Sequence, residues 1–299
     1  MPTNNATDPV LTIFTPAYNR AHTLPRTYES LCRQKCKQFV WLIIDDGSTD
    51  NTAELVKGWQ NRPNGFPIRY IYKENGGMHT AHNTAYANID TELNVCIDSD
   101  DMLADNAVEL ILNKWHKVKD KGFAGIIGLD ADFSGNIIGK SFPQGMTETT
   151  LSGYYAAGGS GDKKLVYRTD VINAYPPYPV FQGEKYVALA YKYLLIDQDY
   201  KLAVLNQTLC NVEYQPDGSS KTMLKQYLKN PKGFAFWRTI KMQYPESFSR
   251  LVRDCIHYCS SSQIAGNRHY IKESPRGLLT VLCTPAGWLL TAYIRRKAL

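Results

Sequence analysis

The sequence lacks the signatures of several large protein classes. No G-x-G-x-x-G follows the first predicted strand and no Walker A motif occurs, so the glycine-rich loops that bind dinucleotides and nucleoside triphosphates are absent. The seven cysteines are odd in number and scattered, which favours a reducing compartment over a disulfide scaffold. Cys255 and Cys259 lie one helical turn apart, but no second pair follows at a spacing typical of zinc sites.

The N-terminus and the net charge indicate where the protein is located and which partners it has. Residues 1–10 (MPTNNATDPV) contain no apolar stretch of the kind found in secretory signals, so we expect a cytoplasmic protein. The net charge of +6 is mild and diffuse, and no recognised nucleic-acid-binding module is present, so we expect no nucleic acid partner. A length of 299 residues suits one α/β domain with an appended segment, or two small domains.

The first 118 residues alternate between two patterns. Short apolar runs typical of buried strands lie at 10–15, 39–44, 68–72 and 93–97. Between them, apolar residues at helical spacing predict helices at 23–34, 51–59, 77–87 and 105–117. Such alternation predicts an α/β fold with a mainly parallel sheet flanked by helices. After residue 120 the pattern loosens, and the glycine-rich stretch 122–161 indicates a loop-rich binding surface.

Polar segments follow three of the predicted strands, at 16–20, 45–50 and 98–101. Ligands of parallel sheets bind beyond the carboxyl ends of the strands, so all three segments should meet in one crevice. The carboxylates of 98–101 (DSDD) would repel one another without a cation, which favours a hard divalent metal; an acidic helix start is the alternative. Segment 45–50 could accept hydrogen bonds from a base or a ribose, or could merely cap a helix.

The ordered motifs TPAYNR (15–20), IIDDGSTDNT (43–52), ENGGMHTAHNTAYA (74–87) and CIDSDD (96–101) resemble those of the family-2 glycosyltransferases, which are inverting enzymes of the GT-A fold. The resemblance covers residues 9–215, its last third weakly. It implies a Rossmann-like catalytic domain over 1–219. Residues 220–299 fall outside the resemblance, and we expect them to form a helical extension. The resemblance also implies that the metal is Mn²⁺ or Mg²⁺ and that the donor is a UDP-sugar.

The resemblance assigns roles to individual residues. The residues implied to contact the nucleotide are Pro16, Ala17, Tyr18, Asp46, Asn75, Gly76, Asn83, Asp98 and Ser99. Among them, Asp46 is implied to contact the base and Asp98 to lie near the ribose. Asp100 is implied to bind the metal together with Asp98, and Asp101 is an alternative ligand. His79 and His82 lie three apart on a predicted helix, where a packing or phosphate-contacting role is favoured over metal ligation.

The implied mechanism is a single displacement with a carboxylate as general base. Glu184, in the acidic element 181–185 (FQGEK), is the candidate base, and a surface or ion-paired glutamate is the alternative. Related proteins usually carry a further acidic residue a few positions later, whereas this chain has VALA at 187–190. Residues 211–218 are expected to form a strand ending in a loop, with Glu213 as a secondary contact.

Residues 277–294 contain no charged side chain and are followed by Arg295, Arg296 and Lys297. Pro285 and Gly287 weaken the case for a membrane-spanning helix, which leaves a core helix pair or an interfacial anchor. We favour the anchor, with Trp288 and Tyr293 at the headgroup level and the basic end on anionic lipid. The expected location is therefore the cytoplasm, with peripheral association of 277–299 at the inner face of the plasma membrane.

The resemblance implies a hexosyl- or N-acetylhexosaminyltransferase acting on a glycan or lipid-linked acceptor, and by analogy places it in polysaccharide synthesis for the cell envelope. Two alternatives stay open. A nucleotidyltransferase that makes the nucleotide-sugar would also place metal-binding carboxylates on an α/β domain, but usually has a glycine-rich basic loop where this chain has TPAYNR. A catalytically silent nucleotide-sugar-binding protein would explain the sparse acidic element around Glu184.

Overall fold

The computed structural model describes residues 8–213 and 223–298 in two compact units. The sheet unit comprises Met1–Asn75, Ala81–Pro177 and Lys192–Glu213, and the helical unit comprises Gly76–Thr80, Tyr178–Tyr191 and Tyr214–Leu299. The expected domain boundary at 219–220 lies outside the described residues. Two short segments before it, 76–80 and 178–191, belong to the helical unit rather than to the sheet unit.

Four parallel strands form the first half of the sheet, in the order β3-β2-β1-β4. The strands and the helices between them are β1 (Leu11–Ala17), α1 (Leu24–Arg33), β2 (Phe39–Asp45), α2 (Thr52–Gln60), β3 (Ile68–Tyr72), α3 (Met78–Asn88), β4 (Leu93–Cys96) and α4 (Ala107–Val118). All eight were predicted, with ends that differ by at most two residues, and the mainly parallel α/β fold is confirmed in this half.

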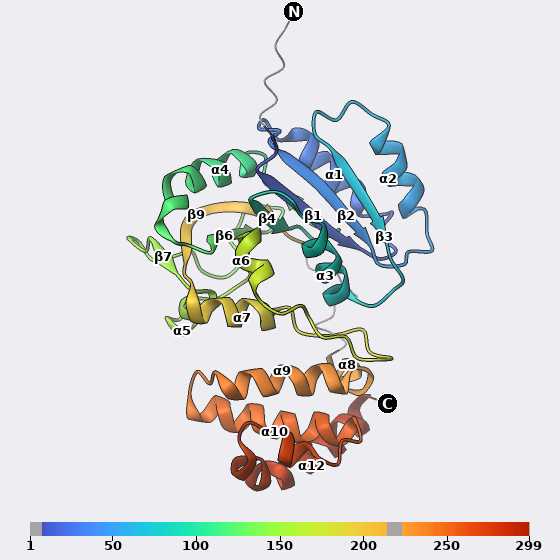
Figure 1. The fold of residues 1–299 in the computed structure, drawn as a ribbon, viewed down its shortest axis with the longest axis vertical. Coiled ribbons are helices and arrows are strands. Elements are labelled where there is room, and N and C mark those ends of the chain that lie inside the picture. The colour runs from blue at the N-terminus through green and yellow to red at the C-terminus, as the bar shows by residue number, and fades with distance from the viewer. Residues whose placement is uncertain (1–7, 214–222, 299) are drawn as a thin grey trace, which may run out of the picture. The chain divides into compact units, whose positions relative to one another are not determined.

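The two faces of the parallel strands are covered by different helices. Leu11 and Ile13 of β1 share a buried core with residues of α1, α2 and α4. Phe14 points to the opposite face, where its ring meets His82 and Tyr86 of α3 edge-on, with centroids 5.0 and 5.4 Å away. Figure 1 shows α3 in front of these strands and α1 behind them. His82 therefore packs against the sheet, which is one of the two roles favoured for it over metal ligation.

The second half of the sheet was not predicted strand by strand. β8 pairs antiparallel with β4, and the order continues β8-β6-β9-β5, with β7 on β9. The elements are β5 (Met102–Leu103), η1 (Lys119–Lys121), β6 (Gly125–Ala131), β7 (Glu148–Thr149), α5 (Leu151–Ala156), β8 (Lys163–Arg168), α6 (Thr169–Ala174), α7 (Ala190–Asp199) and β9 (Leu202–Asn211). The stretch expected to be loop-rich therefore contains β6 and borders β8.

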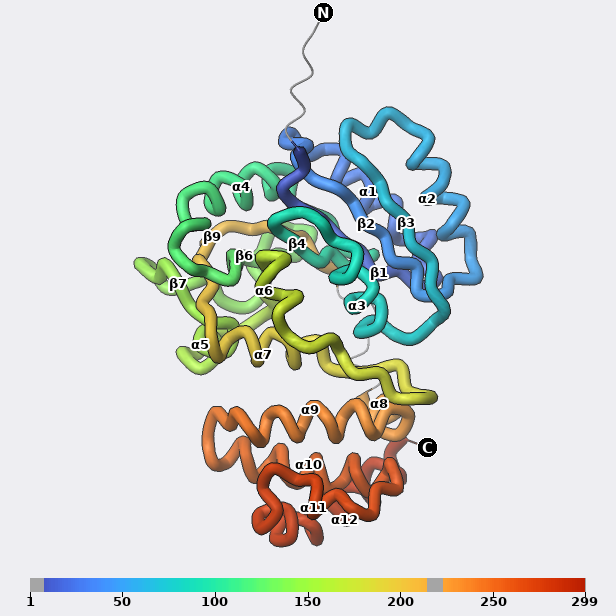
Figure 2. Tube along the Cα trace, viewed as in Figure 1, coloured from blue at the N-terminus to red at the C-terminus, as the bar shows by residue number. Residues whose placement is uncertain are grey.

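The helical unit is built around α10. Its helices are α8 (Met223–Lys229), α9 (Pro231–Gln243), α10 (Phe248–Ile264), α11 (Tyr270–Glu273) and α12 (Gly277–Ala298). α9 and α12 both pack against α10, as Figure 2 shows along the chain trace. α12 is one continuous helix with Pro285 inside it, so the alternative of a helix pair at 277–294 is wrong.

Candidate functional site

Hydrogen bonds join the first two strand-end segments directly. The backbone N–H of Asn19 donates to Ser48 Oγ at 2.9 Å, and the N–H of Thr49 donates back to Asn19 Oδ1 at 2.8 Å. Asn19 has a left-handed φ of 54°, which asparagine tolerates better than most residues. The N–H of Ala21 donates to Asp50 Oδ2 at 3.0 Å. The turns after β1 and β2 therefore form one rigid edge.

The adjacent carboxylates of the second segment have different surroundings. Asp45 is a structural residue, because its carboxylate accepts hydrogen bonds from the backbone N–H of Ser48 at 2.7 Å and from the Tyr70 hydroxyl at 2.5 Å. Asp46 instead forms an ion pair with Lys73, with the Nζ and Oδ1 atoms 2.5 Å apart. Asp46, the predicted base-contacting residue, is thus paired with a cation that the sequence analysis did not single out.

The backbone of Asn75 passes so close to Gly47 that this position must be a glycine. Its φ is +84°, and a Cβ built there would lie 2.7 Å from the backbone nitrogen of Asn75. Asn75 in turn donates from Nδ2 to the carbonyl of Asp46 at 2.7 Å. Only a residue without a side chain allows this approach, so Gly47 fixes the predicted nucleotide residue Asn75 beside Asp46.

The third segment, 98–101, lies beside the first because β4 is the parallel neighbour of β1. The Thr27 hydroxyl of α1 donates to the carbonyl of Asp101 at 2.8 Å. Arg26, one residue earlier, donates to the carbonyl of Asp100, forms an ion pair with Glu213 at 2.7 Å and lies over the Phe133 ring. Arg26 was not predicted, whereas Glu213 was expected near the site; 214–218 lie outside the described residues.

Negative charge is concentrated in this segment. Burial raises the pKa of the Asp101 carboxyl to about 7; Lys164 opposes this increase, and the neighbouring Asp98 and Asp100 add to it. The pKa of Asp100 is also raised, by burial and by Asp98, although the nearby Arg20 opposes the shift. These carboxyls are therefore poorly compensated by the protein alone, and a bound cation would relieve their repulsion.

A buried lysine underlies the acidic segment. Lys164 Nζ on β8 lies 3.8 Å from Asp130 Oδ1 on β6, and both side chains are almost fully shielded from solvent. Burial would lower the pKa of Lys164, but Asp130, and further away Asp101 and Asp98, raise it well above its ordinary value. The pKa of Asp130 is raised because burial outweighs the attraction of the lysine. No pattern in the sequence indicated this pair.

The residues present fit a metal that a ligand helps to hold. Within 8–213 and 223–298 no group of three or more His, Cys, Asp or Glu side chains is placed to bind a metal ion by itself. Asp101 is buried and faces the Cys210 sulfur at 3.9 Å, whereas Asp98 and Asp100 are partly exposed. Mg²⁺ and similar ions are commonly held by one or two carboxylates and the phosphates of a substrate.

The predicted base, Glu184, lies in the helical unit and caps a helix there. Its two carboxylate oxygens accept hydrogen bonds from the backbone N–H groups of Lys232 and Gly233, at 2.9 and 2.8 Å. These N–H groups belong to the first turn of α9, where Asn230 makes no capping bond of its own. The structure therefore gives Glu184 a stabilising role. The catalytic role stays a prediction.

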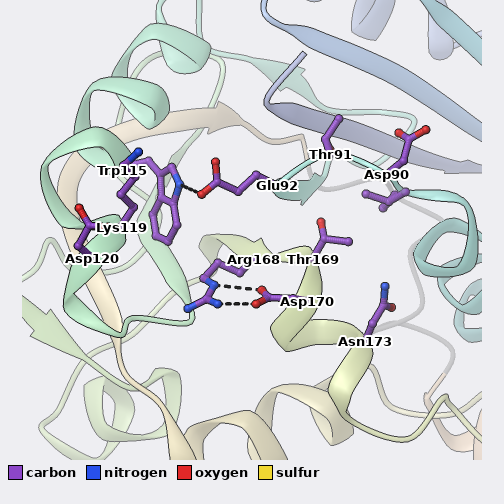
Figure 3. A pocket seen from close by; sticks show the side chains of 11 residues that line it. Asp90, Thr91, Glu92, Trp115, Lys119, Asp120, Arg168, Thr169, Asp170 and Asn173 are labelled. Atoms are coloured by element: carbon purple, nitrogen blue, oxygen red, sulfur yellow. Dashed lines mark hydrogen bonds and ion pairs between the residues drawn. The ribbon is translucent and has the colours of Figure 1, made fainter. Parts of the chain in front are cut away.

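A cavity of the sheet unit lies at the opposite edge of the sheet. It has a volume of about 610 Å³ and is lined by residues that precede β4 and follow β8, among them Glu92 and Thr169. Figure 3 shows the Arg168–Asp170 ion pair inside it and Glu92 accepting a hydrogen bond from the Trp115 indole, at 2.8 Å. None of the predicted site residues lines this cavity.

A mainly parallel sheet flanked by helices, with carboxylates at the carboxyl ends of β2 and β4, defines a protein of the GT-A fold class. The sequence comparison identifies the family. The model of Glycosyl transferase family 2 matches residues 12–172, more than half of the chain, so the protein belongs to that family. The match contains all three strand-end segments and the Lys164–Asp130 pair.

The curated relatives it matches are much longer than this chain. A chondroitin synthase and a hyaluronan synthase of Pasteurella multocida are each 38% identical over 117 residues, which cover 39% of this chain and 12% of each relative. A chondroitin synthase of Escherichia coli is 32% identical over 142 residues, 45% of this chain and 19% of the relative.

Solved structures resemble the fold over nearly the full chain. TarS 1–349 of S. aureus, in complex with UDP-GlcNAc, aligns with a TM-score of 0.58 at 14% identity, covering 96% of this chain and 91% of that one. A mannosyltransferase of Pyrobaculum calidifontis, in complex with GDP-Man and Mn²⁺, aligns with a TM-score of 0.55 at 14% identity, covering 98% and 84%. At these identities the likeness concerns the fold.

Proposed function

We propose that the protein is an inverting glycosyltransferase that moves a hexosyl or N-acetylhexosaminyl group from a UDP-sugar to a glycan or lipid-linked acceptor. The observation that carries the proposal is the meeting of three polar segments at the carboxyl ends of β1, β2 and β4. Membership of family 2 supports transfer over nucleotide-sugar synthesis. The names of the chondroitin and hyaluronan synthases support a polysaccharide product.

The chain's own residues account for donor binding. Asp46 accepts from the base, with Lys73 holding its carboxylate in place. The turn of Pro16, Ala17 and Tyr18 flanks the nucleotide; Ala17 is buried and Tyr18 is exposed for contact. Asn75, Gly76 and Asn83 hold the nucleotide from the segment after β3, and Ser99 and Asp98 approach the ribose.

The acidic segment fits a divalent cation, Mn²⁺ or Mg²⁺, with Asp100 and Asp98 as ligands. The S. aureus structure contains UDP-GlcNAc, and the Pyrobaculum structure contains GDP-Man and Mn²⁺. Both support a site for a nucleotide-sugar, and the second supports a metal. When bound, the cation supplies Lewis-acid stabilisation of the departing diphosphate. The acceptor hydroxyl must lose its proton to a carboxylate, for which Glu184 is our candidate.

A thermal-shift screen tests donor binding. UDP, GDP, CDP and ATP are each added with and without Mn²⁺, and a ligand at a hundred times its dissociation constant stabilises the folded protein by about 2.7 kcal/mol. We expect stabilisation by UDP that requires Mn²⁺ and is lost in Asp100→Ala. Asp120→Ala is the matched control, because Asp120 is an exposed carboxylate at the opposite edge of the sheet. If no nucleoside diphosphate raises the melting temperature, the proposal fails.

A second function, donor binding without turnover, is favoured by one observation: Glu184 already caps α9, and 187–190 carry no carboxylate. Glu184→Gln separates the two functions, because glutamine keeps one acceptor oxygen for the cap but cannot act as a base. We expect this variant to abolish transfer from a UDP-sugar and to bind UDP normally. Near-normal turnover would leave Glu184 only its capping role, and a wild-type protein that binds UDP-sugars but never consumes them would be the silent form.

A further inference from the structure

α12 buries its small and polar residues and exposes its large apolar ones, the opposite of a helix on the surface of a soluble protein. Its buried face consists mainly of small or polar residues: Thr280, Cys283, Thr284, Gly287, Thr291 and Ile294. Its exposed face carries large apolar side chains, with exposed fractions of 79% for Leu278, 69% for Leu282, 60% for Trp288 and 74% for Leu289. A surface helix normally buries its large apolar residues and exposes the polar ones.

The buried face is fixed firmly against α10. A Cβ on Gly287 would lie 2.5 Å from the Cys259 Cβ, so the two helices are in close contact at this position. The Thr280 hydroxyl lies 3.4 Å from the Cys255 sulfur, and the Thr291 hydroxyl lies 3.0 Å from Ser260 Oγ. Small residues and hydroxyl groups allow this close contact, and the large apolar residues of α12 are left on its other face.

The exposed apolar residues form one continuous stripe. Leu278, Leu282, Leu289 and Tyr293 recur at helical spacing along α12, together with Val281 and Trp288. Basic residues flank both ends of the stripe, at Arg268, Lys272, Arg276, Arg295, Arg296 and Lys297, and Glu273 is the only acidic residue in 268–298. The surface thus combines apolar bulk with positive charge at each end.

We propose that α12 lies flat on an anionic membrane surface, with its apolar stripe in the boundary between headgroups and acyl chains. α12 is long and apolar enough to cross a membrane, but a third of its most apolar stretch is buried within the protein. One face of α12 is hydrogen-bonded to α10, so only the opposite face is available to lipid, as in a helix that lies in the membrane plane. The proposal goes beyond sugar transfer and does not depend on it.

The charge distribution argues against a second copy of the chain as the partner. In a two-fold pairing through the stripe, each end of α12 would face an end of its counterpart, and both ends are basic. Such a contact would bring like charges together. A surface of anionic lipid instead attracts both basic ends.

Flotation of the full chain with vesicles tests the proposal. We expect the protein to bind vesicles of phosphatidylcholine with one quarter phosphatidylglycerol, and to bind pure phosphatidylcholine much more weakly. Leu289→Ser should reduce partitioning about tenfold, because a buried leucine contributes at least the 1.4 kcal/mol that a tenfold change requires. Val180→Ser, which alters an apolar residue 65% exposed in the same unit, is the matched control and should bind as wild type.

Two further measurements make the test decisive. Replacing Arg295, Arg296 and Lys297 by glutamine should weaken binding to the anionic vesicles only, and Trp288→Phe should remove the blue shift of tryptophan fluorescence expected on binding. The proposal is overturned if the wild-type chain stays in solution with anionic vesicles, or if Leu289→Ser binds as well as wild type. It is also overturned if sedimentation velocity shows a dimer that Leu289→Ser dissociates while vesicle binding is unchanged.

Discussion

Arg26 of α1 donates a hydrogen bond to the backbone carbonyl of Asp100, the residue that we assign to the metal. The same guanidinium pairs with Glu213 beyond β9, so one side chain links two segments that are 113 positions apart in sequence. The bond is made to the backbone, which leaves the Asp100 carboxylate available to a ligand. Arg26 therefore orients the acidic segment without occupying it.

Arg26→Ala should weaken Mn²⁺-dependent binding of UDP about tenfold, because hydrogen bonds from a charged group contribute roughly 1.5–3 kcal/mol and the segment 98–101 would lose its orientation. Isothermal titration calorimetry measures the change. Arg33→Ala is the control on the same helix, since Arg33 forms only a surface ion pair with Asp105. Equal affinities of the two variants would show that Arg26 does not orient the site.

Gly47→Ala should lower the free energy of unfolding by about 1–3 kcal/mol and abolish UDP binding, because the new Cβ would collide with the Asn75 backbone at a strained φ. Gly58→Ala should have the opposite effect on stability, a gain of about 0.5–1 kcal/mol. Gly58 lies within α2 and a Cβ there meets nothing within 4 Å. Urea denaturation of both variants tests the contrast.

Lys164→Met should destabilise the sheet unit by about 3–5 kcal/mol, because it leaves Asp130 buried without its cation. Adding Asp130→Asn to the Lys164→Met variant should recover part of the lost stability, because it removes the unpaired charge. Lys201→Met removes one partner of an exposed ion pair with Glu148 and should cost under about 1 kcal/mol. Urea midpoints that fall equally in Lys164→Met and Lys201→Met would contradict this account.

The helical unit should lose stability as the pH falls from 6.5 towards 4. Burial, followed by the positive charge of Arg238, lowers the pKa of His257 to about 4 from an ordinary value of 6.5. Between these values the unfolded chain binds a proton that the folded chain does not, so acid favours unfolding. NMR titration should show a neutral His257 ring at pH 5, and His257→Asn should flatten the stability profile. A ring protonated near pH 6.5 would refute the prediction.

Local sequence was sufficient for β1 to β4 and failed for β6 and β8, for a physical reason. The early strands are mainly apolar and are followed by polar residues, whereas β8 begins with two lysines (KKLVYR). Lys163 is buried because its ammonium donates to carbonyl oxygens of Ile138 and of residues 160–162. Those partners come from loops, and no periodicity within β8 could indicate them.

The candidate site was predictable to the same extent. The strand-end segments could be placed together because parallel neighbours end at one edge of the sheet. Arg26, Lys73 and Lys164 were missed because their roles depend on partners brought close only by folding. For Glu184, an acidic motif could be recognised in the sequence, but its capping role could not. The N–H groups that it caps lie 48 and 49 positions further along the chain.

The division of the chain into units has a consequence for engineering hybrid enzymes. Because 178–191 belongs to the helical unit but is encoded between two segments of the sheet unit, the C-terminal helices are not a detachable module. A chimera joined after Glu213 would take from the other parent both the residue that replaces Glu184 at the first turn of α9 and the one that replaces Lys185, whose backbone N–H now donates to Asn230 at 2.8 Å. Recombination among relatives must therefore exchange both parts together, which ties any change in the C-terminal surface to a change inside the catalytic half.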